Sequence, residues 1–167
     1  MSFTFLSPSR SAEGTVTSPL RRALEHADPG AVRDLSLESI VELRGDVDAV
    51  PTHPGEELLR LSPRRGFLFT GDDALGVVER ARAAGVLAYD ATGAYAGLAI
   101  ASEQVMHRLT DLDLERIPTA GPFAHVTALV RQDAEGWFRV CVHQELGHYV
   151  AEAVLDAIAG LEGSAWH

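Results

Sequence analysis

Residues 57–85, ELLRLSPRRGFLFTGDDALGVVERARAAG, predict two short strands followed by a helix. Apolar residues dominate 57–62 and 66–70, and the Pro-Arg-Arg stretch between these segments is typical of a hairpin turn. The pairing that collects four apolar side chains on one face joins Leu61 with Phe67 and Leu59 with Phe69.

A capped helix completes this unit, and the whole unit is repeated later in the chain. Asp72 or Asp73 is expected to cap the helix, which ends near Ala84 with Gly85 after it. Two explanations of the repeat stay open, an ancestral duplication and two similar units with similar packing needs. Either one predicts an α+β fold of two ferredoxin-like halves, with antiparallel or mixed sheets and helices packed on one face. A shift of 71 residues aligns Leu58, Arg60, Phe67, Leu75 and Gly76 with Leu129, Arg131, Phe138, Leu146 and Gly147.

The repeated hairpin is predicted from 123–131 and 137–143. A register in which paired residue numbers sum to 268 places a wholly apolar face on the core. Tryptophan and arginine on the other face are typical of interface hot spots, so we expect either a partner or a cover from 1–38 or 111–122. The apolar pairs are Val130 with Phe138, Ala128 with Val140, and Val126 with Val142. The other face carries His125, Thr127, Leu129, Arg131, Trp137, Arg139, Cys141 and His143.

The remaining elements are predicted singly. Ser18 and Pro19 are typical of a helix start, and Gly160 and Gly163 are expected to end the last helix. The segment 111–122 shows no clear periodicity. Strands are predicted at 39–44, 86–90 and 95–100, and helices at 18–26, 103–109 and 145–159.

The composition predicts a globular protein with an acidic surface. The 167 residues include 24 Asp and Glu against 14 basic residues, a formal net charge of −10. Such a surface repels phosphate backbones and anionic lipids, so we expect no nucleic-acid or membrane partner. All basic residues are arginine, and the absence of lysine excludes Schiff-base, pyridoxal-phosphate and P-loop chemistry. The single cysteine, Cys141, excludes an internal disulfide and a multi-cysteine metal cage.

The ends of the chain and its hydropathy predict its setting. Residues 1–17 are rich in Ser, Thr, Gly and Pro, which indicates a flexible arm ahead of a single domain over 18–167. The sequence shows neither the pattern of a secretory signal nor an apolar stretch of membrane-spanning length. We therefore expect a cytoplasmic protein.

Histidines gather in the C-terminal half, but their spacing does not predict a metal site. His143 and His148 are five positions apart on a predicted strand and helix, whereas a zincin pair is four apart on one helix. His107 and His125 are expected at the surface. Cys141 and His143 share a strand face about 7 Å apart, too far for a nucleophile and its base, so we expect a buried, inert thiol.

The charged clusters also have structural explanations. Helix capping and solvation account for the acid pairs Glu56–Glu57 and Asp72–Asp73, and these acids offset the charge of Arg64–Arg65. No glycine pattern typical of a nucleotide cradle occurs. The residues alone therefore predict no catalytic residue and no metal ligand, and they leave any cofactor-binding residues unknown.

Residues 89–117, YDATGAYAGLAIASEQVMHRLTDLDLERI, carry a family resemblance. They resemble the segment shared by glycine-cleavage aminomethyltransferases and the gamma subunit of heterotetrameric sarcosine oxidase. In that segment an Asp-x-Ser strand end precedes an apolar strand, a small-residue turn, an amphipathic helix and a D-L-D-L-like element. Asp90-Ala91-Thr92 replaces Asp-x-Ser here, and Ile100-Ala101-Ser102 stands where the family usually has a glycine. Shorter similarities at 18–20, 42–46, 59–69 and 138–150 extend the resemblance in order over 18–160.

Within this superfamily the gamma-subunit type fits best. The strand 123–131 has no carboxylate where aminomethyltransferases carry their catalytic aspartate, and a lysine-free chain cannot hold the K-G-C-Y-x-G-Q-E signature of the iron–sulfur-repair relatives. The resemblance implies a non-catalytic structural subunit, bound to larger flavoprotein subunits that oxidatively demethylate sarcosine or a related N-methyl amine. FAD, FMN and NAD would belong to those subunits, and tetrahydrofolate would receive the one-carbon unit.

Two other functions stay open at this point. One is a stand-alone protein that binds tetrahydrofolate or transfers one-carbon units. The other is a ferredoxin-like homo-oligomer that binds a small molecule. We expect this chain to hold no cofactor of its own, with tetrahydrofolate as the exception left open.

Overall fold

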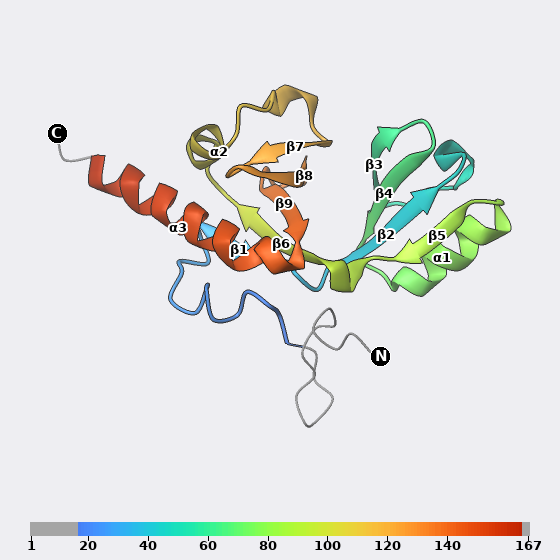
Figure 1. The fold of residues 1–167 in the computed structure, drawn as a ribbon, viewed down its shortest axis with the longest axis horizontal. Coiled ribbons are helices and arrows are strands. Elements are labelled where there is room, and N and C mark those ends of the chain that lie inside the picture. The colour runs from blue at the N-terminus through green and yellow to red at the C-terminus, as the bar shows by residue number, and fades with distance from the viewer. Residues whose placement is uncertain (1–16, 165–167) are drawn as a thin grey trace. The chain divides into compact units, whose positions relative to one another are not determined.

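The structure is a computed structural model that describes residues 17–164. The chain divides into two compact units. Of the described residues, unit 1 combines those up to Ser36 with those from Ala94 onward, and unit 2 is Leu37–Gly93 (Figure 1). All but the last residue of the expected arm, 1–17, lies outside the described residues, and the proposed single domain over 18–167 stays a prediction.

Unit 2 is a four-stranded antiparallel sheet with one helix on one face. Its strand order is β3-β4-β2-β5, and α1 packs on β2 and β5 (Figure 1). Buried side chains such as Val41, Leu43 and Val77 join sheet and helix in one core. The elements are β2 (Ser39–Arg44), β3 (Glu57–Ser62), β4 (Arg65–Thr70), α1 (Ala74–Ala83) and β5 (Leu87–Asp90), with a 3-10 turn at Val47–Ala49.

The helix of unit 2 begins and ends as its sequence predicts. The Asp73 carboxylate accepts a hydrogen bond from the Leu75 backbone N–H at 3.2 Å and so caps the first turn. Gly85 follows the helix with φ +75°, a conformation that glycine adopts without steric cost. The cap and this glycine fix where the chain leaves α1 for β5.

The register of the first hairpin differs from the prediction by two residues. Leu59 pairs with Phe67 and Glu57 pairs with Phe69. The reason is a tighter turn, because Ser62 pairs directly with Arg65 after a register shift between Arg60 and Ser62. The predicted pairing of Leu61 with Phe67 is therefore wrong, and Leu61 is 38 % exposed.

Unit 1 is a five-stranded antiparallel sheet with two helices on one face. Its strand order is β1-β6-β9-β8-β7, and α2 and α3 lie together over the sheet (Figure 1). The elements are β1 (Val32–Asp34), β6 (Tyr95–Ile100), α2 (Glu103–Leu109), β7 (Thr119–Phe123), β8 (Val126–Gln132), β9 (Phe138–His143) and α3 (Gly147–Ser164), with 3-10 turns at Thr92–Ala94, Leu114–Arg116 and Gln144–Leu146.

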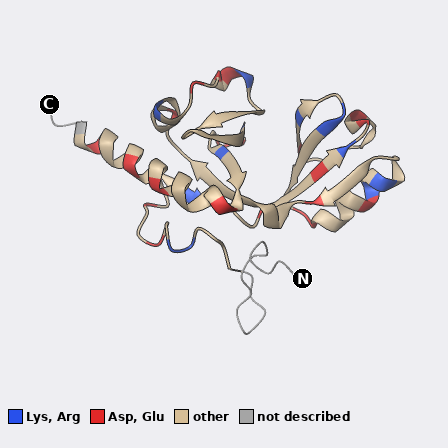
Figure 2. Cartoon of the chain, viewed as in Figure 1, with Lys and Arg blue, Asp and Glu red and all other residues tan. Residues whose placement is uncertain are grey.

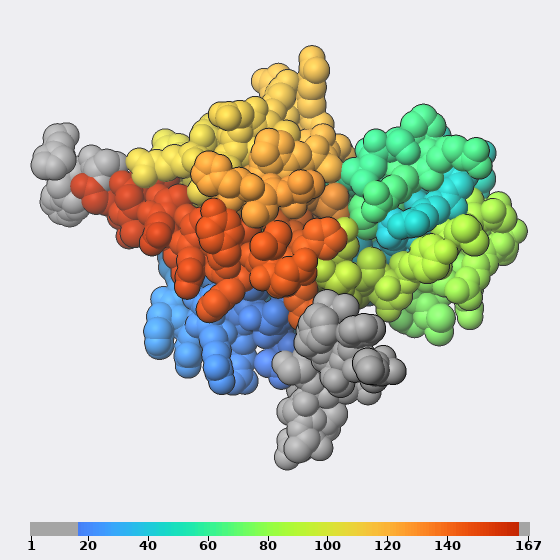
Figure 3. All heavy atoms as spheres, viewed as in Figure 1, coloured from blue at the N-terminus to red at the C-terminus, as the bar shows by residue number. Residues whose placement is uncertain are grey.

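The start of α3 lies close to the sheet and to the first described segment. A Cβ atom on Gly147 would stand 2.6 Å from Ala96 Cβ and 3.0 Å from Leu20 Cδ2. Figure 3 shows the blue N-terminal segment of unit 1 beside the red α3. Glycine at position 147 therefore permits the close approach of helix, strand and segment.

The second hairpin is also shifted by two residues. Val130 pairs with Val140 and Ala128 with Val142, so that paired numbers sum to 270 instead of 268. A closed turn causes the shift: the Asp133 N–H donates to the Trp137 carbonyl at 3.0 Å, and Gly136 has φ +88°. A shift of two residues keeps the side chains of β8 and β9 on their predicted faces.

Three expectations about unit 1 are wrong. The predicted strand 123–131 is interrupted by a two-residue turn at 124–125, and the unpredicted β7 precedes it. Residues 18–26 form turns instead of a helix, and the unpredicted β1 follows them. The last helix continues through Gly160 and Gly163 to Ser164, since a glycine costs a helix only about 1 kcal/mol.

Both units have the same strand order. The strand order of unit 2 is β3-β4-β2-β5. Four of the five strands of unit 1 correspond to these one by one, in the order β8-β9-β6-β1. This is the arrangement of a ferredoxin-like sheet, so the prediction of two ferredoxin-like halves is confirmed. Unit 1 adds β7 at one edge, and its other edge strand, β1, comes from the chain before unit 2.

Candidate functional site

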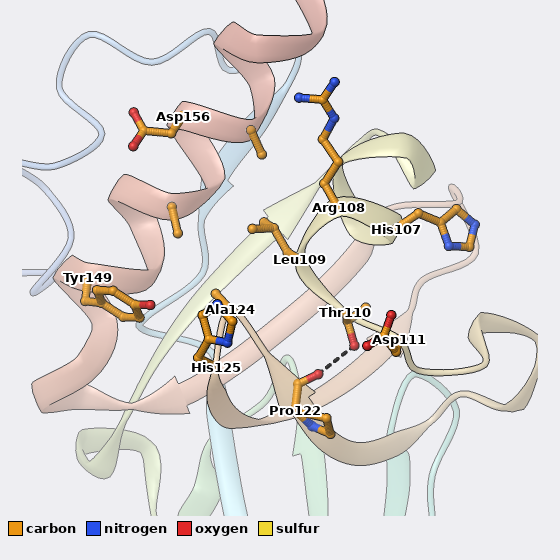
Figure 4. Close-up of a pocket in the computed structure, with 12 residues that line it drawn as sticks. His107, Arg108, Leu109, Thr110, Asp111, Pro122, Ala124, His125, Tyr149 and Asp156 are labelled. Carbon is orange, nitrogen blue, oxygen red and sulfur yellow. Dashed lines mark hydrogen bonds between the residues drawn. The ribbon is translucent and has the colours of Figure 1, made fainter.

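A groove in unit 1 is the candidate site. It lies between the C-terminal end of α2, the turn that joins β7 to β8, and one side of α3 (Figure 4). Its volume is about 540 Å³, within the range of small-molecule sites. We call it the α2–α3 groove; its walls include His107, Arg108, Thr110, His125, Tyr149 and Asp156.

One wall of the groove is a strained turn. Ala124 and His125 have φ +46° and +66°, where side chains other than glycine are disfavoured. Two hydrogen bonds tie the turn to the end of α2: the Ala124 N–H donates to the Leu109 carbonyl at 2.7 Å, and the Thr110 hydroxyl donates to the Pro122 carbonyl at 2.6 Å. Strain held in this way is typical of binding sites.

The opposite wall comes from α3. Small side chains at Ala153 and Ala157 leave space above the helix. Tyr149 is 46 % exposed, and Figure 4 shows its ring reaching from α3 toward His125 on the turn. The groove can therefore accept a small molecule between an aromatic side chain and an imidazole.

Charged side chains of both signs line the groove. Arg108 extends toward α3, and a Cβ atom on Gly160 would stand 2.7 Å from its Nη1. Asp156 lies on α3, where Figure 2 shows acidic residues along the helix. This mixture gives the groove no single charge preference.

The four histidines that the sequence analysis singled out, His107, His125, His143 and His148, do not form one cluster. His107 contacts Glu103 one helical turn away at 3.2 Å. His143 stacks on Tyr95 with ring centroids 5.1 Å apart, and His148 is exposed on α3. Among residues 17–164 no group of three His, Cys, Asp or Glu side chains could hold a metal ion. Only His107 and His125 share the groove.

Cys141 is buried, as predicted, with 1 % of its surface exposed. It lies mid-strand in β9 opposite Leu129 and Gly97. A carbonyl oxygen of Leu35 would stand 3.0 Å from a Cβ on Gly97, so the segment after β1 lies over this part of the sheet.

The face with Trp137 and Arg139 is partly covered from within unit 1. The Arg33 guanidinium of β1 lies 3.9 Å from the centre of the Trp137 ring, and Arg139 pairs with Asp133 at 3.0 Å. The alternative that residues before 38 fold back over this face is therefore confirmed in part. Partner contact at this face stays a prediction.

The expectation that the acidic residues of unit 2 are solvated is wrong for Glu56, which pairs with an arginine. A second acid–arginine cluster forms around Glu42. The Glu56 side chain is 3 % exposed, and both of its oxygens accept from Arg80 Nη2 at 2.6 Å. The partner of Arg65 is Glu42, at 2.8 Å, and not one of the acid pairs. Burial raises the pKa of Glu42, but hydrogen bonds from Arg44 and Arg65 outweigh it and hold that pKa below its ordinary value. These clusters stabilise loops and strands, and nothing in them points to catalysis.

The groove itself was not predicted. Its walls come from residues 107–111, 122–125 and 149–157, which only the folded sheet brings together. The one sequence signal was the crowding of histidines, and it singled out four residues of which two line the groove. Positive φ at Ala124 and His125 leaves no mark in the sequence, because the usual Asn-Gly of such a turn is absent.

The fold and the groove define a small α+β protein of two ferredoxin-like units. Its fold is similar to that of a chain in the structure of heterotetrameric sarcosine oxidase from Corynebacterium sp. U-96 in complex with pyrrole 2-carboxylate. The TM-score is 0.74 with 12 % sequence identity, over 86 % of this chain and 95 % of that chain. At 12 % sequence identity this similarity shows a shared fold and nothing more.

Other comparisons add little. The regulatory subunit of aspartate kinase from Thermus thermophilus, in its ligand-free form, matches with a TM-score of 0.45 and 14 % identity, over 75 % of this chain and 96 % of that chain. No protein-family model matches the sequence, and no curated protein matches it either. None of the helices within residues 17–164 combines the length and the apolar composition that a membrane span needs.

Proposed function

We propose that this chain is a non-catalytic structural subunit of a sarcosine-oxidase-like complex, which oxidatively demethylates sarcosine or a related N-methyl amine in the cytoplasm. One observation carries the proposal: the fold of nearly the whole chain matches 95 % of a chain from a heterotetrameric sarcosine oxidase. A fold shared over 86 % of this chain and 95 % of that chain supports a similar place in a similar assembly.

The proposal places the redox cofactors in the partners. FAD, FMN and NAD belong to the larger flavoprotein subunits, since the sequence lacks a nucleotide-binding glycine pattern. The residues that line the groove include no serine or cysteine, and the Thr110 hydroxyl donates to the Pro122 carbonyl, so none of them is set up as an activated hydroxyl or thiol nucleophile. In this proposal the chain has a structural role in the complex and binds the larger subunits through its surface.

Purification from the source cells tests this proposal. A C-terminal tag on the chain should retrieve larger subunits with flavin absorption that is bleached by sarcosine or another N-methyl amine. The same chain expressed alone should be colourless and should not oxidise the amine. A colourless chain retrieved alone from its source, or flavin bound tightly to the isolated chain, would contradict the proposal.

The α2–α3 groove favours a second candidate, a protein that binds tetrahydrofolate or another small molecule directly. A ligand present at 100 times its Kd stabilises a protein by about 2.7 kcal/mol. Tetrahydrofolate should then raise the melting temperature of the isolated chain, and His125→Ala together with Tyr149→Ala should abolish the rise. An unchanged melting temperature at millimolar tetrahydrofolate removes tetrahydrofolate as the ligand of the groove.

A further inference from the structure

The edge strand β5 differs from the other sheet edges of this protein. Leu87 and Tyr89, in β5, are 61 % and 50 % exposed. Both side chains lie on the face of the sheet opposite its core, because their partners on β2 are Arg44 and Glu42. Two large apolar side chains thus lie next to each other on a strand that, within the described residues, has a neighbour on one side only.

The backbone of β5 is also available for pairing. Two hydrogen bonds beyond the ends of the strands show which residues of β2 face β5. The Gly45 N–H donates to the Arg64 carbonyl, on the side of β4, and the Ala91 N–H donates to the Ile40 carbonyl, on the side of β5. Because backbone bonds alternate along an antiparallel pair, Leu87 and Tyr89 direct their backbone groups toward β2. The N–H and C=O groups of Ala88 and Asp90 therefore point away from the sheet.

The other sheet edges carry residues that discourage pairing. Natural edge strands are protected by charged side chains and proline. β1 contains Arg33 and Asp34, β3 contains Glu57 and Arg60, and β7 contains Pro122. β5 has only Asp90, at its last position, and that carboxylate accepts a hydrogen bond from the Thr92 N–H at 2.9 Å. Of the four edges in residues 17–164, β5 alone presents an unprotected Leu-Ala-Tyr stretch.

We propose that β5 is a docking edge, where an extended segment of a larger partner subunit adds a fifth strand to the sheet of unit 2. The inference rests on the proposed function and names the surface through which this chain joins its complex. The segment would carry apolar side chains at alternate positions to cover Leu87 and Tyr89. It would carry a carboxylate beside Arg44, because Arg44 and Arg65 share the single carboxylate of Glu42 and leave a positive excess.

A second copy of this chain is a poor occupant for the edge. Two copies paired through β5 would join two strands of only four residues each, whereas a stable interface buries roughly 1,200 Å² or more. Each copy also carries a net charge of −10, which opposes self-association. A large partner can extend the contact beyond the strand, so the edge needs to supply only part of the interface.

The test places charges on the edge and measures assembly. Leu87→Lys combined with Tyr89→Lys in the tagged full chain should lower the flavin retrieved from source cells by at least about tenfold, or about 1.4 kcal/mol. Leu87→Thr with Tyr89→Thr, which keeps strand-favouring residues, should lower it in the same direction. Leu75→Lys is the control, since Leu75 is 58 % exposed on α1, and α1 covers the face of the sheet opposite to Leu87 and Tyr89. Melting temperatures of all variants show whether the chain still folds.

Hydrogen exchange supplies a second readout. The amides of Ala88 and Asp90 should exchange fast in the isolated chain and slowly in the complex. If wild-type chain retrieves the flavoprotein and the Lys variant retrieves it equally, the docking edge is wrong while the proposed function stands. If the wild-type chain retrieves no flavoprotein, both the docking edge and the proposed function are wrong. A wild-type dimer that the Lys variant converts to a monomer would assign the edge to a second copy and overturn the proposal.

Discussion

Asp133 organises the turn between β8 and β9 through one carboxylate. Its Oδ1 accepts from the N–H groups of Glu135 and Trp137, both at 2.9 Å, and its Oδ2 accepts from Arg139 at 3.0 Å. Burial raises the pKa of Asp133, but these hydrogen bonds outweigh it and hold that pKa below its ordinary value. The charged form of Asp133 therefore stabilises the folded chain.

The pH dependence of stability follows with a definite sign. The unfolded chain takes up a proton at Asp133 first, at pH about 3.9, so the stabilisation is complete above that pH and is lost as the pH falls through the lower folded-state pKa. Asp133→Asn should lower the free energy of unfolding by about 1–3 kcal/mol at pH 7. Denaturant titrations should show this difference shrinking below pH 4. Glu135→Gln removes an exposed charge from the same turn and should leave the curve almost unchanged; equal effects of both variants would contradict the argument.

Helix α3 contains glycines with opposite structural demands. A methyl group on Gly147 would meet Ala96 Cβ at 2.6 Å, whereas one on Gly163 would meet nothing within 4 Å. Gly147→Ala should destabilise the chain by about 1–3 kcal/mol because the helix must move off the sheet. Gly163→Ala should be neutral or stabilise it by up to about 1 kcal/mol. Thermal unfolding of the two variants measures the contrast, and a similar shift for both would show that helix propensity alone decides.

Local signals of the sequence located most elements but not their pairing. The cap at Asp73 and the apolar residues over 39–44 and 95–100 predicted α1, β2 and β6 within a residue or two. Register depends on turn geometry, and a turn one or two residues shorter or longer moved both hairpins by two positions. β7 has a Gly-Pro pair and little apolar pattern, so only its pairing with β8 makes it a strand. The groove depends on three such elements meeting and was therefore beyond local signals.

The molecule as a whole repeats one sheet order with two different chain connections. In unit 2 the edge strand β5 follows α1, whereas in unit 1 the corresponding strand β1 precedes unit 2 in the chain. The sequence repeat predicted the shared unit of two strands and a helix. It did not predict that the edge strand of unit 1 comes from the chain before unit 2. A pairing between residues 34 and 98 leaves no pattern that a short window of sequence can show.

This connection has a consequence for the order in which the protein assembles. β1 and β6 must find each other across the whole of unit 2, and a long loop is costly in entropy to close. Once unit 2 has formed, β2 and β5 pair Val41 with Asp90, so its two ends leave the sheet side by side. Folded unit 2 then shortens the effective loop between β1 and β6, in which Asp34 pairs with Leu98. During synthesis the strands β6, β8 and β9 and the helix α3 all follow unit 2, so the sheet of unit 1 can be completed only after the whole of unit 2 has been made.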